Sequence, residues 1–129
     1  MPPSATVLLY SSDAGTRAQV RLATGRKPAS DIPPVAFLEC ATVDAVLEAL
    51  GTGRIDACVL DGEAVPLGGM GVCRQIKNEV FQCPPVLLLI ARPQDAWLAR
   101  WSLADATVTL PVEPVELAAA LAALLRAAH

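Results

Sequence analysis

Histidine is almost missing from this chain, and that shortage limits the chemistry it can support. The single histidine, His129, is the last residue, so no imidazole is placed to act as a base for a serine nucleophile. No two of the four cysteines form a C-x-x-C pair, and this spacing gives poor support for a zinc site. Cys40, Cys58 and Cys73 lie in apolar surroundings and are expected to be buried, reduced thiols, while Cys83 lies in a predicted loop.

Blocks of like charge and long apolar runs are also missing. Ten basic and thirteen acidic residues give a formal net charge of −3, without a basic stripe or an aromatic ladder, which argues against nucleic-acid binding. No apolar run approaches the roughly 18 residues that span a membrane. The first apolar run, Val7 to Tyr10, is too short for a secretory signal. The sequence therefore predicts a cytoplasmic protein.

Apolar residues make up 53% of the 129 residues, enough for one domain (1–129) with an aliphatic core. Short apolar runs alternate with amphipathic segments. The expected strands are Ala5–Tyr10, Val35–Glu39, Ala57–Leu60, Val86–Ile90 and Ala106–Thr109. The expected helices run from about Asp13 to Thr24, Val43 to Leu50, Val72 to Lys77 and Gln94 to Leu103, and from Pro114 onward. This alternation predicts an α/β fold with five parallel strands, helices on both faces and no separate effector domain.

An acid, Asp61, directly follows the apolar run Ala57–Leu60, and a loop rich in glycine and proline comes next. Ligands of open α/β sheets bind outside the carboxyl ends of the strands, so Asp61 is placed where a functional group would be. The loop is not a phosphate-binding P-loop, because no Gly-Lys-Ser/Thr follows it. From this position alone, Asp61 is either a functional acid or a structural carboxylate.

Four segments together resemble the receiver domain of two-component response regulators. They are VLLYSSDAGTR, LDGEAVPLGGMGVCRQIK, PVLLLIAR and ADATVTLPVEPVEL, which are similar to the family's first strand, its phosphoacceptor strand with the third helix, its fourth strand, and its fifth strand with the last helix. The resemblance covers nearly the whole chain. It implies a doubly wound, flavodoxin-like sheet of order 2-1-3-4-5, a cis peptide bond before Pro111, and a role in phosphorelay signal transduction that is not enzymatic.

The resemblance also implies which residues would form the site. Asp61 occupies the position of the aspartate that accepts the phosphoryl group. The remaining positions depart from the family: Ser11 and Ser12 replace the acid pair that holds Mg²⁺, Ile90 replaces the hydroxyl residue of the fourth strand, Thr107 replaces the switching aromatic, and Leu110 replaces the lysine.

These departures remove the groups that neutralise a transferring phosphoryl group. Mg²⁺ prefers oxygen anions, and a neutral hydroxyl offers no compensating charge, so we expect Mg²⁺ binding to be weak or absent and no other cofactor. Asp61 would then stay ionised by accepting a hydrogen bond from Ser11 or Ser12. The sequence thus predicts a pseudo-receiver that works through phosphorylation-independent protein–protein interaction.

Two alternatives stay open. One is a degenerate receiver that is still phosphorylated on Asp61. The other is a small flavodoxin-like enzyme or ligand-binding domain, although the sequence contains neither an acid–base pair nor a phosphate-binding fingerprint.

Trp97 and Trp101 are i,i+4 neighbours on one expected helix, so they lie on the same side of it. We expect one of them to pack inward and the pair to form a candidate interface, because exposed tryptophans are often binding hot spots. In the family, the fourth helix, fifth strand and last helix form a partner or dimer face. A protein partner, or a second copy of the chain, is therefore expected to bind there.

Overall fold

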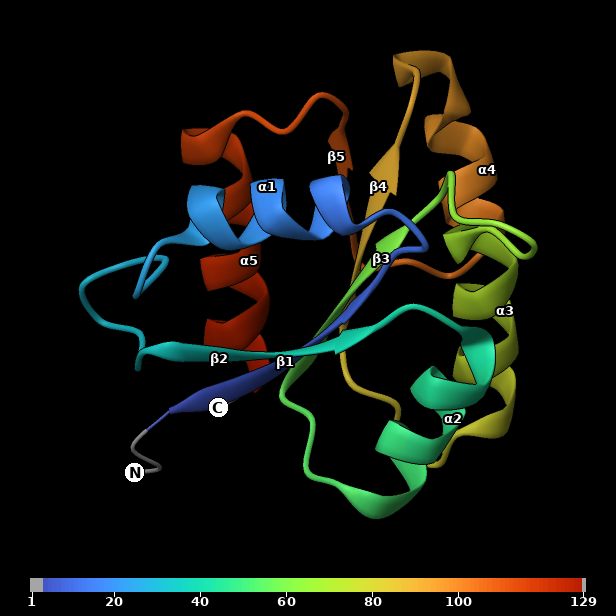
Figure 1. Cartoon of the computed structure of the whole chain (residues 1–129), viewed down its shortest axis with the longest axis horizontal. Coiled ribbons are helices and arrows are strands. Elements are labelled where there is room, and N and C mark those ends of the chain that lie inside the picture. Colours follow the sequence, from blue (N-terminus) through green and yellow to red (C-terminus); the bar gives the residue numbers. More distant parts are fainter. Residues whose placement is uncertain (1–3, 129) are drawn as a thin grey trace.

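The computed structural model describes residues 4–128, whose five parallel strands form one sheet (Figure 1). The strand order is β2-β1-β3-β4-β5, which confirms the predicted flavodoxin-like topology. The strands are β1 (Ala5–Tyr10), β2 (Val35–Cys40), β3 (Ala57–Asp61), β4 (Val86–Ile90) and β5 (Ala106–Thr109). They agree with the predicted strands to within one residue at each end.

The helices are α1 (Ala14–Thr24), α2 (Val43–Thr52), α3 (Gly69–Glu79), α4 (Ala96–Trp101) and α5 (Pro114–Ala128), with a 3₁₀ turn at Pro93–Asp95. Three side chains expected to cap the first turns of helices do accept backbone N–H groups there. Asp13 accepts the Gly15 N–H, Thr42 accepts the Ala45 N–H, and Glu113 caps the last helix. Among residues 4–128, no helix combines the length and apolar character needed to cross a membrane.

Side chains that alternate along each strand divide the core into two layers. In β1, Val7 and Leu9 pack on the layer that includes residues of α1 and α5, whereas Leu8 and Tyr10 pack on the layer beneath α2, α3 and α4. Figure 1 shows these two helix groups on opposite faces of the sheet. Every residue of β3 and β4 is buried, as expected for central strands of a parallel sheet.

The fourth helical segment differs from the prediction. In place of one helix over Gln94–Leu103, the chain makes the 3₁₀ turn and then the short helix α4. The expectation that one tryptophan packs inward is wrong, because Trp97 is 66% exposed and Trp101 is 53% exposed. The residue of α4 that packs against the core is Ala99, which is 2% exposed.

The cysteines behave as apolar core residues. Cys40, Cys58 and Cys73 are buried, as predicted, and Cys83 is half-buried. Burial raises the pKa of the Cys73 thiol to about 11 and also raises the pKa values of the other three thiols. All four thiols are therefore protonated at neutral pH.

A bidentate ion pair links α5 to the loop before β2, and the contribution of this pair to stability should depend on pH. Arg126 donates from Nε to Asp31 Oδ2 (2.7 Å) and from Nη2 to Oδ1 (2.9 Å), which lowers the pKa of Asp31 to about 2. Because this folded-state pKa is depressed, the pair stabilises the fold above the ordinary aspartate pKa and stops doing so as the pH falls toward 2. In an NMR titration, Arg126→Gln should return the pKa of Asp31 to roughly 3.9.

The matched control for this titration is Arg26→Gln, which removes an exposed arginine that does not act on Asp31. It should leave the Asp31 titration unchanged. An Asp31 pKa near the ordinary value in the unsubstituted protein would show that the pair does not form in solution.

Candidate functional site

Asp61 ends β3 at the carboxyl edge of the sheet and is only 3% exposed. Its Oδ2 atom accepts a hydrogen bond from Ser11 Oγ at 2.7 Å, and its Oδ1 atom accepts one from the Glu63 N–H at 2.9 Å. Ser11 itself is fully buried. Both carboxylate oxygens are therefore engaged within the protein, and the expected bond from a serine is made by Ser11.

Three consecutive side chains at the end of β1 hold the segment from Asp61 to Leu67. The hydroxyl of Tyr10 donates to Leu67 O at 2.5 Å, Ser11 donates to Asp61, and Ser12 Oγ accepts the Val65 N–H at 3.0 Å. Burial, and to a smaller extent the charge of Asp61, raise the pKa of Tyr10, so its hydroxyl remains a donor at neutral pH. We call these three residues the hydroxyl triplet.

Sequence reasoning missed the role of Tyr10. The position of Tyr10 at the end of a buried strand could have indicated this role, because a buried tyrosine hydroxyl usually forms a hydrogen bond. The sequence also gave no warning of the cis peptide bond between Val65 and Pro66, whereas the cis bond before Pro111 is confirmed.

The backbone around Asp61 is tightly packed because α3 starts directly against β3. A Cβ atom at Gly69 would lie 2.7 Å from Asp61 O, and one at Gly62 would lie 2.6 Å from Leu89 O. The backbone segments approach so closely that these two positions require glycine. The helix α3 begins at Gly69, three residues before the predicted Val72.

The remaining predicted positions lie on the neighbouring strands and contribute no polar side chain to Asp61. Ile90 ends β4 and is 2% exposed, and its carbonyl accepts the Leu110 N–H at 2.7 Å. Leu110 is half-buried and packs on the α1–α5 layer. Thr107 is exposed on β5. The structure thus brings Ser11 into contact with Asp61, whereas Ser12 bonds to the loop that follows Asp61. The side chains of Ile90 and Leu110, beside the ends of β4 and β5, are apolar.

Two curated relatives decide the family. The chain is 45% identical, over 130 residues and 98% of each chain, to an uncharacterized response regulatory protein of Mycobacterium tuberculosis, in the CDC 1551 strain and in the H37Rv strain. The chain is a response-regulator receiver domain. No family model matches its sequence.

Solved structures agree with this receiver fold. The receiver domain of the Francisella response regulator 1452 has a TM-score of 0.81 at 16% identity, covering 97% of this chain and 99% of that one. A two-component response regulator from Clostridium difficile has a TM-score of 0.77 at 18% identity, covering 95% and 96%. At these identities the likeness concerns the fold alone.

The residues of this receiver domain do not fit a magnesium ion. Ser11 and Ser12 are neutral, and the Asp13 carboxylate is used at the start of α1, where it accepts from the Gly15 N–H and the Thr16 hydroxyl. Within the described part of the chain, no three His, Cys, Asp or Glu side chains are grouped so that they could hold a metal ion. Asp61 supplies the carboxylate at the end of β3, and each of its two oxygens already accepts one hydrogen bond.

Arg17, an arginine that contacts the end of β1, is also committed to other groups. Arg17 donates from Nη1 to Ser11 O at 2.6 Å and pairs with Glu39 at 3.0 Å, and Arg21 pairs with the same Glu39 oxygen at 2.6 Å. Glu39 therefore offsets part of the positive charge that could otherwise balance a phosphoryl group.

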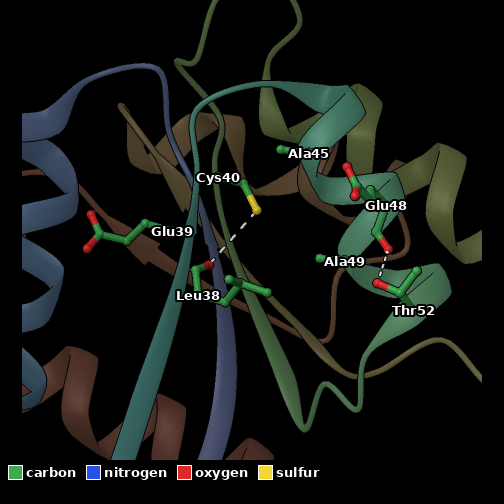
Figure 2. Close-up of a pocket in the computed structure, with 7 residues that line it drawn as sticks. All are labelled: Leu38, Glu39, Cys40, Ala45, Glu48, Ala49 and Thr52. Carbon is green, nitrogen blue, oxygen red and sulfur yellow. Dashed lines mark hydrogen bonds between the residues drawn. The ribbon is translucent and has the colours of Figure 1, made fainter.

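A separate groove of about 290 Å³ lies between β2 and α2 (Figure 2). Figure 2 shows Leu38 and Cys40 facing α2, while Glu39 points away from the groove. The lining includes neither Asp61 nor a residue of the hydroxyl triplet, and it contains no acid–base pair. The groove is thus separate from the carboxyl-edge site and supplies no catalytic constellation.

Proposed function

We propose that this receiver domain is a pseudo-receiver, which acts in signal transduction through protein contacts that do not depend on phosphorylation of Asp61. The observation that carries this proposal is the engagement of both Asp61 oxygens, by Ser11 Oγ at 2.7 Å and the Glu63 N–H at 2.9 Å. A buried carboxylate satisfied in this way is a structural group. When an oxygen of Asp61 attacks a phosphodonor, the carboxylate loses its charge, so phosphorylation would weaken these charge-assisted hydrogen bonds.

Electrostatics support the same proposal. Phosphorylation of Asp61 would add negative charge at a buried position where Leu110 and Ile90 supply no donor. Positioned cations stabilise transferring phosphoryl groups by several kcal/mol, and each 1.36 kcal/mol is a factor of about ten in rate. Without a bound cation or a lysine, we expect phosphorylation to be slower by orders of magnitude than in a complete receiver site.

The output of such a domain must come from its surface. Trp97 and Trp101 are the most conspicuous candidates, since both are more than half exposed on α4. We propose that a protein partner, or a second copy of the chain, binds this surface in the cytoplasm. Tryptophan-rich surfaces of this kind often dominate the free energy of protein–protein binding.

The alternative function is a degenerate receiver with Asp61 as the acceptor. One observation favours it, because Asp61 lies at the carboxyl end of β3, where the family's acceptor is found. The two functions differ in one measurable product, an acyl phosphate on Asp61.

The test is incubation with acetyl phosphate and Mg²⁺, read by intact mass, beside a complete receiver domain as a positive control. We expect no adduct on this chain under conditions that label the control fully. An adduct that hydroxylamine removes, and that Asp61→Asn abolishes, would establish the degenerate receiver instead.

A further inference from the structure

Both tryptophans of the chain lie on one exposed ridge. Trp97 is 66% exposed and Trp101 is 53% exposed, and their i,i+4 spacing puts them on the same side of α4. Leu103, directly after the helix, is 46% exposed. Isolated exposed apolar residues are common, but three large ones within seven sequence positions are unusual, and exposed apolar patches often mark binding sites.

The ridge faces α3. The Arg74 guanidinium, from α3, lies 5.0 Å from the centroid of the Trp101 ring, and its Nη1 atom donates to Trp101 O at 2.6 Å. The contact is a cation–π pair reinforced by a hydrogen bond. The surface therefore spans α3 and α4, whereas the family resemblance implies a face made by α4, β5 and α5.

Positive charge flanks the ridge without a matching acid. Within residues 4–128, neither Arg74 nor Arg100 of α4 forms an ion pair. Arginine side chains are cations in proteins, so each of the two contributes positive charge to this surface. On a chain with a formal net charge of −3, this is a local cationic and aromatic surface on an acidic protein.

We propose that the ridge of Trp97, Trp101 and Leu103, flanked by Arg74 and Arg100, binds an acidic segment of a partner protein that carries apolar anchor residues. This inference rests on the proposed function and adds the chemistry of the partner. Apolar side chains of the segment pack on the indole rings, and its carboxylates pair with the two guanidinium groups, which match a carboxylate in two-point geometry.

The arrangement of Arg74 suits this role. Its guanidinium is already held by the Trp101 carbonyl and ring, so it loses little side-chain freedom when a carboxylate binds. A protein segment is favoured over nucleic acid or an anionic membrane for an electrostatic reason. The overall negative charge of the chain repels extended polyanions, whereas a short acidic segment meets only the local cations.

The experiment is selection of a displayed random-peptide library on the intact chain, followed by titration of the enriched peptides. Because the chain has two tryptophans and both lie on the ridge, tryptophan emission excited selectively, so that Tyr10 does not contribute, reports this surface. We expect enriched peptides rich in Asp or Glu and in large apolar residues. They should shift the tryptophan emission to shorter wavelength and bind more weakly as salt is raised.

Two variants test the assignment. Arg74→Gln combined with Arg100→Gln should weaken binding of the enriched peptides at least tenfold, and Trp97→Ala combined with Trp101→Ala should abolish it in a calorimetric titration. The matched control is Phe81→Ala, which removes an apolar side chain that is 89% exposed outside the ridge and should leave binding unchanged.

Enrichment of basic or neutral peptides, or peptide binding that survives loss of both tryptophans, would overturn the inference. So would an equal emission shift with phosphatidylglycerol vesicles or single-stranded DNA. The phosphodonor assay is independent of these outcomes. If the ridge fails while Asp61 remains unphosphorylated, the partner chemistry is wrong and the pseudo-receiver proposal stands.

Discussion

Ser11→Asp is expected to destabilise the receiver domain by about 3–5 kcal/mol at pH 7, because it replaces a hydrogen-bond donor with a second carboxylate. Ser11 is fully buried and its Oγ lies 2.7 Å from Asp61 Oδ2. A hydrogen bond to a charged group contributes about 1.5–3 kcal/mol, and two like charges about 4 Å apart repel by roughly 4 kcal/mol at an effective dielectric constant of 20. The expected loss is smaller than the sum of these two values, because partial protonation of the carboxylate pair relieves part of the repulsion. Urea denaturation monitored by circular dichroism measures the loss.

The matched control is Ser12→Asp. Ser12 is exposed and its oxygen only accepts the Val65 N–H, a role that a carboxylate can also fill, so the change should cost less than about 1 kcal/mol. In Ser11→Asp, one carboxyl of the close pair can take up a proton as the pH is lowered, and part of the loss should be recovered near pH 4.

The double variant Ser11→Asp/Ser12→Asp adds a readout for metal. Two added carboxylates beside Asp61 should create Mg²⁺-dependent stabilisation, through preferential binding of Mg²⁺ to the folded state, and we expect no such stabilisation of the unsubstituted protein. Full stability of Ser11→Asp at pH 7 without Mg²⁺ would mean that Ser11 and Asp61 are not in contact, and the structural argument for the pseudo-receiver would fall.

A second large effect is expected at Gly69, where Gly69→Ala should cost about 2–3 kcal/mol through overpacking. The added Cβ would lie 2.7 Å from Asp61 O and 2.8 Å from Asp61 C, and both are backbone atoms of a central strand. They cannot rotate away as a side chain would. Relief of the clash requires α3 to move from β3, which also displaces the hydrogen bonds around Asp61.

The matched control is Gly51→Ala. Gly51 lies inside α2, and a Cβ there meets nothing within 4 Å, so alanine should stabilise the protein by about 0.5–1 kcal/mol through its better helix propensity. Denaturation midpoints that move in opposite directions for the two variants are the expected result. Equal midpoints would show that the connection between β3 and α3 tolerates a shift.

Much of this fold could be predicted because its signals are local. Buried strands appear as short apolar runs such as Val86–Ile90, and Asp13, Thr42 and Glu113 precede their helices in the way that caps do. The sheet order came from the family resemblance, since periodicity alone does not determine which strands are neighbours. The contact between Ser11 and Asp61 followed once the two strand ends were placed side by side.

The features that escaped prediction depend on distant atoms. The bond from Tyr10 to Leu67 joins residues 57 positions apart, and no local pattern specifies the partner of that hydroxyl. The exposure of both tryptophans on α4 depends on Ala99 taking the inward position. The early start of α3 depends on backbone contact at Gly69, which sequence spacing does not reveal.

The hydroxyl triplet of Tyr10, Ser11 and Ser12 has a consequence for how the cell could regulate this domain. The three hydroxyls are uncharged, and burial raises the pKa of Tyr10 further; Ser11 alone of the three bonds a carboxylate, that of Asp61. Changes in magnesium concentration, or in pH around neutrality, should therefore leave the conformation of the segment after β3 unaltered. Under the pseudo-receiver proposal, control of the output would have to act on the partner-binding surface and not on the segment after β3.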